Sequence, residues 1–476
     1  MSCSKIFSGD LPELMYKIIK YFQNDYSTLY SCILVNRLWC RLTIPLLWED
    51  PFSIPTKNYN FIEIYLHDLN DDFKTKLNEY EIINKTLPSN ILFNYTGFLK
   101  YMNIYKFITS IEKWFESAIS KNRLVNLSDI CVSLFETFIE NEVNLHTFEI
   151  EILDDHRTCN DNILELILKN TNFIYNIRNL NLYIDGLSDY NHINKYISNI
   201  SQIINLQQNL KKTSLNYYGF PLFQPLLSKD YNYSNTLNTI IFYHVDFKVI
   251  NNLEKVFERL NVLESVHIYY CRSLITINNI ELFDLSLKQQ LLKLIATFCK
   301  NIKFLDFNHG SEIQIIYQLL NLIENINKQN LSYHSINIKY RSCVSAYCSI
   351  ILPNLGQILP PKLEYLCLNF FYIKARVKLF YLLQKNLSIL SSIKEYIMKK
   401  KRVKYLAIKE ASLFKDLISF KDEVNEFRLY NIEVKSYDGM PGFCTCWTFK
   451  GIPDFLHTLD FKGKLGTPGF CKHWTF

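Results

Sequence analysis

The sequence has little glycine, and this limits the sites that it can form. Only 12 of its 476 residues are glycine, and half of these lie after residue 436. A nucleotide-binding turn between a strand and a helix needs closely spaced glycines, because phosphate must approach the bare backbone there. Neither such a turn nor a Walker phosphate-binding loop is present, which argues against a nucleotide-dependent enzyme.

Signatures of catalysis are also missing. There is no G-x-S-x-G elbow, no H-E-x-x-H helix, no kinase motif set and no catalytic Cys/His signature. The ten histidines are isolated, and His244 and His267 fall on predicted strands, where structural roles are more common than metal ligation. Acidic pairs such as Asp71 and Asp72 lie in polar, loop-like stretches typical of solvated turns. We therefore assign no catalytic residue, no cofactor and no metal.

Long apolar runs are absent as well. The first ten residues, MSCSKIFSGD, lack the apolar core of a signal peptide, and no stretch approaches the roughly 20 apolar residues of a membrane span. We expect a cytoplasmic or nuclear protein with its 13 cysteines reduced and no membrane partner. The net charge is only +6 and the cations are dispersed, apart from 399–402, which we interpret as a solvated helix end rather than a nucleic-acid site.

Residues 8–50 carry the most informative pattern. Asp10, Pro12 and Glu13 together predict a helix start with Asp10 as the N-cap. Apolar residues then recur at helical spacing: Leu11, Leu14, Met15, Ile18, Ile19 and Phe22. Two more short helical runs follow, around Leu29–Val35 and Asn36–Trp48. Three short helices enclose too little core to bury all of these side chains, so part of this surface requires a partner.

The ordered series LPELMYKIIKYF, Leu29–Val35 and VNRLWCRLTIPLLW resembles an F-box, over roughly a tenth of the chain. The resemblance implies docking onto the adaptor Skp1 of a cullin-RING ubiquitin ligase. Carried onto this sequence, it gives nine candidate Skp1-binding residues: Leu11, Pro12, Leu14, Ile18, Ile19, Leu29, Cys32, Val35 and Trp39. The alternative is a three-helix cap that buries the same stripe against the rest of the protein.

Beyond a break at Pro51–Pro55, residues 51–143 have a mainly helical pattern, interpreted as a helical linker region. From 144 to 436, short strand patterns alternate with helical ones. The predicted strands cover 146–153, 177–184, 213–220, 237–247, 263–271, 302–308, 334–340, 362–370, 403–410 and 427–434. The intervening helices are predicted at 162–168, 193–204, 253–260, 287–298, 313–326 and 375–390.

The strand centres recur at about the period of a leucine-rich repeat. These centres are Phe148, Leu180, Leu215, Ile240, Val266, Leu305, Ile336, Leu366 and Leu406. Some units have the form Leu-x-x-Leu-x-Leu, as at Leu363, Leu366 and Leu368, and an asparagine ladder is suggested at Asn181, Asn216 and Asn369. The fold class we predict is α/β: an N-terminal three-helix F-box, a helical linker and an irregular leucine-rich-repeat solenoid. A doubly wound α/β domain is the rival fold.

Residues 437–476 contain two copies of a Gly/Pro/aromatic motif, Gly439–Phe449 and Gly466–Phe476, and we expect a weakly ordered tail. Cysteine and histidine are common zinc ligands, and the tail contains four of them: Cys444, Cys446, Cys471 and His473. The spacing of these four differs from zinc knuckles, so no metal is assigned. The function that the F-box resemblance implies is a non-catalytic substrate receptor of an SCF ubiquitin ligase, binding a Skp1-like adaptor with its cullin complex and an unidentified target protein. A repeat scaffold without ligase association is the alternative.

Overall fold

The computed structural model describes most of the first half of the chain, with several gaps, and the second half mainly at its strands. The main described segments are 11–54, most of 56–77, 91–118, 126–184, 190–216, 236–243, 262–269, 302–309, 333–340, 364–372, 403–410, 415–416, 421–429 and 431–436. The predicted helices at 287–298, 313–326 and 375–390, most of 253–260, and the tail at 437–476 lie outside them.

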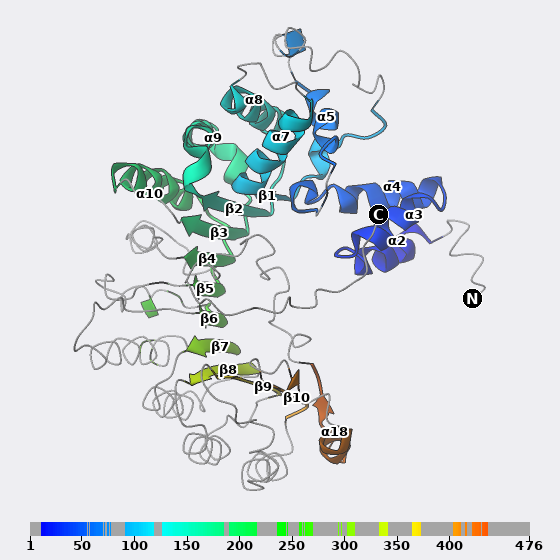
Figure 1. The fold of residues 1–476 in the computed structure, drawn as a ribbon, viewed down its shortest axis with the longest axis vertical. Coiled ribbons are helices and arrows are strands. Elements are labelled where there is room, and N and C mark those ends of the chain that lie inside the picture. Colours follow the sequence, from blue (N-terminus) through cyan, green and yellow to red (C-terminus); the bar gives the residue numbers. More distant parts are fainter. Residues whose placement is uncertain are drawn as a thin grey trace, which may run out of the picture.

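The chain forms helices and a largely parallel sheet of twelve strands (Figure 1). From β1 to β11, the strands lie side by side in the order in which they occur in the sequence. All neighbours from β1 to β10 run parallel, while β11 is antiparallel to β10, and β12 also pairs with β10. The mixed α/β class predicted from the sequence is confirmed. The strands are β1 (Tyr101–Asn103), β2 (Thr147–Ile152), β3 (Asn179–Ile184), β4 (Lys212–Asn216), β5 (Thr239–Tyr243), β6 (Ser265–Tyr269), β7 (Phe304–His309), β8 (Tyr333–Tyr340), β9 (Tyr365–Tyr372), β10 (Tyr405–Glu410), β11 (Lys415–Asp416) and β12 (Glu433–Val434).

The described helices gather mainly around the first strands. In Figure 1, α7 to α10 follow one another along one side of β1 to β3, and α2 to α4 form a separate group beside β1. The helices are α2 (Pro12–Tyr21), α3 (Tyr26–Ile33), α4 (Arg37–Leu47), α5 (Phe61–Leu66), α7 (Ile104–Ala118), α8 (Leu127–Glu140), α9 (Arg157–Lys169), α10 (Tyr190–Asn205) and α18 (Lys421–Arg428), with short 3-10 turns η1 (Pro51–Ser53), η2 (Thr96–Phe98), η3 (Asp154–His156) and η4 (Thr171–Ile174).

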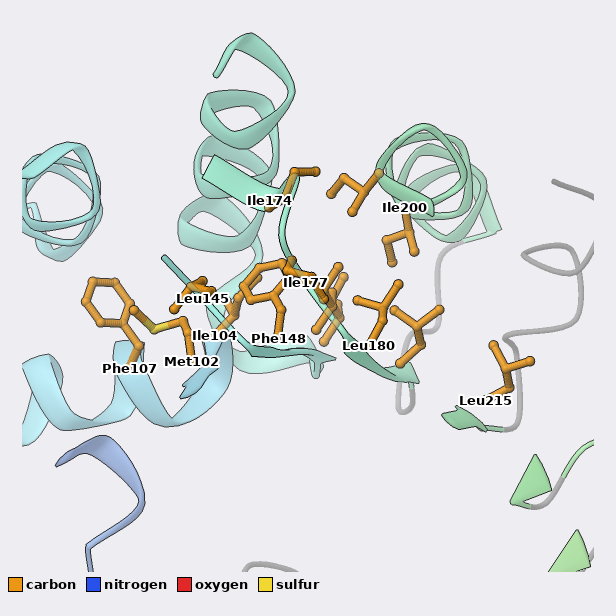
Figure 2. Close-up of a cluster of buried hydrophobic side chains, with 14 of the residues drawn as sticks. Met102, Ile104, Phe107, Leu145, Phe148, Ile174, Ile177, Leu180, Ile200 and Leu215 are labelled. Carbon is orange, nitrogen blue, oxygen red and sulfur yellow. The ribbon is translucent and has the colours of Figure 1, made fainter. Parts of the chain in front are cut away.

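Alternation along the strands separates a buried face from a polar one. On β2, Phe148, Ile150 and Ile152 are fully buried, whereas Glu149 and Glu151 between them are partly exposed. Successive side chains of a strand point to opposite faces, so one face of the sheet packs against the helices. Figure 2 shows this core, in which Phe148 and Leu180 lie on the same side of the sheet as Ile174 and Ile200.

Neighbouring strands begin in the same way. The N–H groups of His146 and Thr147 both donate to the carbonyl oxygen of Lys100, at 2.8 and 3.0 Å. Arg178 and Asn179 repeat this arrangement on His146. These strands are therefore aligned by the residue directly before the preceding strand, and the aligning residues form a row along the edge of the sheet.

Nine of the ten predicted strands are confirmed, and the tenth, 427–434, is wrong. Phe427 lies in α18, and only Glu433 and Val434 pair as a strand. Asn431, with φ of 60°, ends the helix: its N–H donates to Arg428 O and the next N–H, from Ile432, donates to Phe427 O. This is a Schellman ending with Phe427 and Ile432 both buried, so the apparent alternation in FRLYNIEV belongs to a helix end.

Two further details differ from the sequence analysis. The three-residue strand β1 lies inside the region read as helical, because Leu99, Met102 and Ile104 also fit a helical stripe. The register pairs Thr213, not Leu215, with Leu180, and His334, not Ile336, with Leu305. Both shifts are of two residues, so the face assignment is unchanged.

Replacing Phe148 with alanine should lower the free energy of unfolding by about 3–5 kcal/mol, because it removes a fully buried ring between sheet and helices. Urea denaturation followed by circular dichroism measures the change. The control is Leu92→Ala, whose side chain is 85% exposed and whose loss should change stability by less than about 0.5 kcal/mol. Equal effects of the two substitutions would contradict the position of the core.

Candidate functional site

Helices α2, α3 and α4 form a small unit with its own core, which we call the N-terminal module. Ile19, Leu29 and Leu46 make up a buried cluster that is separate from the main core. Partly buried side chains surround it: Tyr16, Phe22, Trp39, Leu42 and Leu47. Helix α4 packs against both α2 and α3, so the module is held together mainly by its third helix.

A proline in the first turn of α2 and side-chain caps on α3 and α4 mark where the three helices begin. The N-cap of α2 is Leu11 without a side-chain cap, so the prediction of Asp10 as the N-cap is wrong, and Pro12 occupies the first turn. Asp25 caps α3 by accepting from the backbone N–H of Thr28 at 3.1 Å and from its hydroxyl at 2.6 Å, and these bonds lower the pKa of Asp25. Asn36 caps α4 by accepting from the Trp39 N–H at 3.0 Å.

The nine candidate Skp1-binding residues divide into three groups. Pro12, Leu14, Ile18 and Val35 are exposed, and Leu11 and Trp39 are partly exposed. The remaining three, Ile19, Leu29 and Cys32, are buried inside the module, so their side chains do not reach a partner in this structure. Their role here is to hold α2 and α3 in place.

Exposed apolar side chains are concentrated on α2 and α3. Among the described residues, nine large hydrophobic side chains are exposed, and six of them fall between residues 14 and 35. We call these six the N-terminal apolar surface: Leu14, Ile18, Tyr21, Tyr30, Leu34 and Val35. Tyr21 is 88% and Leu34 75% exposed. Such a concentration of exposed apolar side chains is typical of an interaction surface.

Sequence reasoning missed three members of this surface, Tyr21, Tyr30 and Leu34. Their spacing held a signal: Tyr21 follows Leu14 by seven residues, and Leu34 follows Tyr30 by four, so each extends an exposed helical stripe. The signal was hidden because both helices carry apolar residues on more than one face.

The N-terminal module is attached to the sheet through two consecutive residues. The ring of Trp48 contacts Phe61, Tyr65 and Tyr95, with centroid distances of 6.4, 5.4 and 4.4 Å. The carbonyl oxygen of Glu49 accepts from the N–H groups of Lys100 and Tyr101, both at 3.0 Å. The second contact is the same strand-start arrangement that joins the later strands, so the module continues directly into the sheet.

A polar row crosses the face of the first strands opposite the apolar core, and its two asparagines, Asn103 and Asn181, are buried. Asn103 donates to Glu149 at 2.8 Å and to Glu151 at 2.9 Å, and Asn181 donates to Glu149 at 2.7 Å. Burial raises the pKa of Glu151, against the lowering effect of its bond from Asn103. At Asn181, the position suggested for an asparagine ladder, the side chain instead donates a cross-strand hydrogen bond to the carboxylate of Glu149. The structure does not describe the side chains of Asn216 and Asn369, the other two suggested positions.

The described residues supply no evident catalytic or metal centre. Cys131 and Cys159 are buried and share a hydrogen bond, which lowers the pKa of Cys159, while burial raises that of Cys131. Within the described part, there is no group of three or more His, Cys, Asp or Glu residues placed to hold a metal. The four candidate zinc ligands of the tail lie outside it. None of the helices searched there is long and apolar enough to cross a membrane.

The fold and its surfaces define a mixed α/β chain with an N-terminal helical module and a long sheet of consecutive strands. No protein-family model matches the sequence, and no curated protein is significantly similar to it.

Replacing Asp50 with asparagine should stabilise the protein at neutral pH. Asp50 lies next to the junction, and burial raises its pKa to about 6 from 3.8. The folded state binds this proton more tightly than the unfolded chain, so the wild type loses stability as pH rises from about 4 to 6. Asparagine carries no charge, and we expect a gain of about 3 kcal/mol at pH 7 that disappears near pH 3.5.

Urea denaturation across this pH range measures the difference. Asp71→Asn serves as the control, because the Asp71 side chain is fully exposed, and its pH profile should follow that of the wild type. A gain for Asp50→Asn that is the same at pH 3.5 and pH 7 would contradict the assignment to a buried charge.

Proposed function

We propose that this chain is the substrate-recognition subunit of an SCF (Skp1–cullin–F-box) E3 ubiquitin ligase. The observation that carries the proposal is the N-terminal module itself: it has a core of its own, yet leaves Leu14 and Ile18 of the F-box-like stripe exposed together with four further apolar side chains. Docking of α2 and α3 on an adaptor such as Skp1 would remove this surface from water. That burial is favourable by about 25 cal/mol per Å² of apolar area.

The arrangement of the sheet supports an irregular leucine-rich-repeat solenoid as the second half of the proposal. Helix α9 lies between β2 and β3 in the chain, and α10 between β3 and β4, while the paired strands keep chain order. A doubly wound sheet instead reverses its strand order at a switch point. No such reversal occurs among the described strands, so the repeat array is favoured over the nucleotide-binding architecture.

In this role the chain has no chemical step of its own. The N-terminal module binds the adaptor, the sheet binds a target protein, and ubiquitin transfer belongs to an enzyme held elsewhere in the assembly. The contribution of the chain is to raise the effective concentration of the target near that enzyme.

A repeat scaffold without ligase association is the second candidate. Two contacts favour it, as they would attach a terminal cap: Trp48 packs against rings of α5 and of the segment before η2, and Glu49 accepts hydrogen bonds at the start of β1. The two candidates differ in whether the N-terminal apolar surface has a partner.

The double substitution Leu14→Asp and Ile18→Asp should weaken Skp1 binding at least about thirtyfold, because it places two charges in the apolar centre of the contact. Both side chains are already exposed, at 41% and 38%, so the melting temperature should change by only a few degrees. Copurification with Skp1 and calorimetric titration measure the binding.

Two comparisons make this result specific. Leu92→Asp places a charge on another exposed leucine, outside the module, and should leave binding intact. Leu29→Ala should reduce binding only together with melting of the module, since Leu29 is fully buried. If the wild-type chain does not bind Skp1, the scaffold becomes the better function; if it binds and the double variant binds equally well, the contact lies elsewhere.

A further inference from the structure

Four basic residues stand next to one another at the edge of the sheet where the strands begin. We call Lys100, His146, Arg178 and Lys211 the basic row. Backbone hydrogen bonds connect them in series: His146 N–H donates to Lys100 O at 2.8 Å, Arg178 N–H to His146 O at 3.0 Å, and Lys211 N–H to Arg178 O at 2.7 Å. They are far apart in the sequence, and the strand register alone brings them together.

The side chains of the basic row are available to a ligand. Arg178 and Lys211 are exposed, and Lys100 and His146 are partly exposed. The pKa of His146 is lowered by burial and then by the charges of Arg178, Lys100 and Lys211, as expected where several cations surround one imidazole. An acidic residue, Glu49, lies next to Lys100 at one end of the basic row, and burial raises the pKa of its carboxyl group against the lowering effect of the charge of Lys100.

Further along the same edge, the cations are neutralised. Lys303 forms an ion pair with Glu264, and Lys404 forms one with Glu364 at 2.9 Å, each joining adjacent positions of the strand-start arrangement. Lys435 lies 3.8 Å from Glu433 near the end of the sheet. Among the described residues, no ion pair involves Lys100, Arg178 or Lys211. The edge therefore changes from a positive segment at β1–β4 to paired charges at later strands.

We propose that the basic row binds an acidic segment of a partner protein, a short stretch rich in aspartate and glutamate. Neighbouring strands are about 4.8 Å apart, so the four residues span roughly 14 Å. An extended peptide advances about 3.4 Å per residue, so a run of about five residues covers this length. Each cation belongs to a different strand, and such a line of separate point charges matches singly charged carboxylates.

The carboxylates of the neighbouring face favour a peptide over a nucleic acid. Glu149 lies three residues after His146 on the same strand, about 10 Å away. A double-stranded nucleic acid carries phosphates along both of its chains and is broad enough to extend past the basic row. Its phosphates would approach Glu149 and be repelled. A single acidic stretch lying along the edge avoids this carboxylate.

This inference extends the proposed function, because the acidic segment would belong to the recruited target. The basic row lies outside the N-terminal module, however, so peptide binding and Skp1 binding are measured separately and can fail separately.

The test is fluorescence anisotropy of a labelled octapeptide of alternating aspartate and glutamate, titrated with the full chain at low and physiological salt. The triple variant Lys100→Gln, Arg178→Gln and Lys211→Gln should bind roughly tenfold more weakly, since each exposed ion pair contributes modestly. The matched control is Lys303→Gln, Lys404→Gln and Lys435→Gln, which removes the same charge from cations that already have carboxylate partners, and its affinity should stay within about twofold of wild type.

Three results would overturn the proposal. The first is no binding of the peptide by the wild-type chain at low salt, and the second is equal weakening by both triple variants, which would indicate attraction to net charge alone. The third is tighter binding of a single-stranded oligonucleotide or a phosphopeptide of equal charge with the same dependence on the basic row. Circular dichroism of both variants ensures that a loss of affinity is not a loss of fold.

Discussion

The parallel pairing of consecutive strands is the constraint on which the rest of this molecule depends. Because the first strands are aligned by the residue directly before the preceding strand, residues at equivalent positions line up in rows across the sheet. Side chains alternate between faces, so the row containing Phe148 and Leu180 faces the helices and the row containing Glu149 and Asn181 lies on the opposite, polar face. Core, polar face and basic edge are three consequences of one register.

This explains which parts of the fold could be predicted from the sequence. The period-two alternation around Phe148 and Leu180 is local, and it identified strands whose partners are far away. The strand β1 is too short for a period, and its apolar residues match the adjoining helix equally well. Residues 427–434 alternate by chance across a helix end. The register at Leu215 and Ile336 could not be predicted, because the segments between strands vary in length. The residues of one strand do not show which residues of its neighbour they pair with.

The candidate site was only partly predictable for a different physical reason. In a three-helix unit, apolar residues serve both as the internal core and as an outer surface, and the same helical spacing describes both. Ile19 and Ile18 are neighbours on α2, yet one is fully buried and the other exposed. The packing of Ile19 with Leu29 of α3 and Leu46 of α4 decides between them. The basic row was hidden more completely, since its members appear in the sequence as the dispersed cations of a nearly neutral chain.

The junction between module and sheet links the two surfaces. Trp48 packs on three rings, Glu49 begins the strand-start arrangement, and Asp50 is a carboxyl group whose burial raises its pKa to about 6. Three consecutive residues thus set the position of the N-terminal apolar surface relative to the basic row. A buried carboxylate at such a place costs stability at neutral pH, where the hydrogen bond from Ser53 and the charge of Lys106 offset only part of its desolvation. Because the aromatic contacts and the backbone bonds act on the same short segment, the module cannot turn away from the sheet without breaking both. A partner that bound the apolar surface would therefore be held in a defined orientation toward the edge of the sheet.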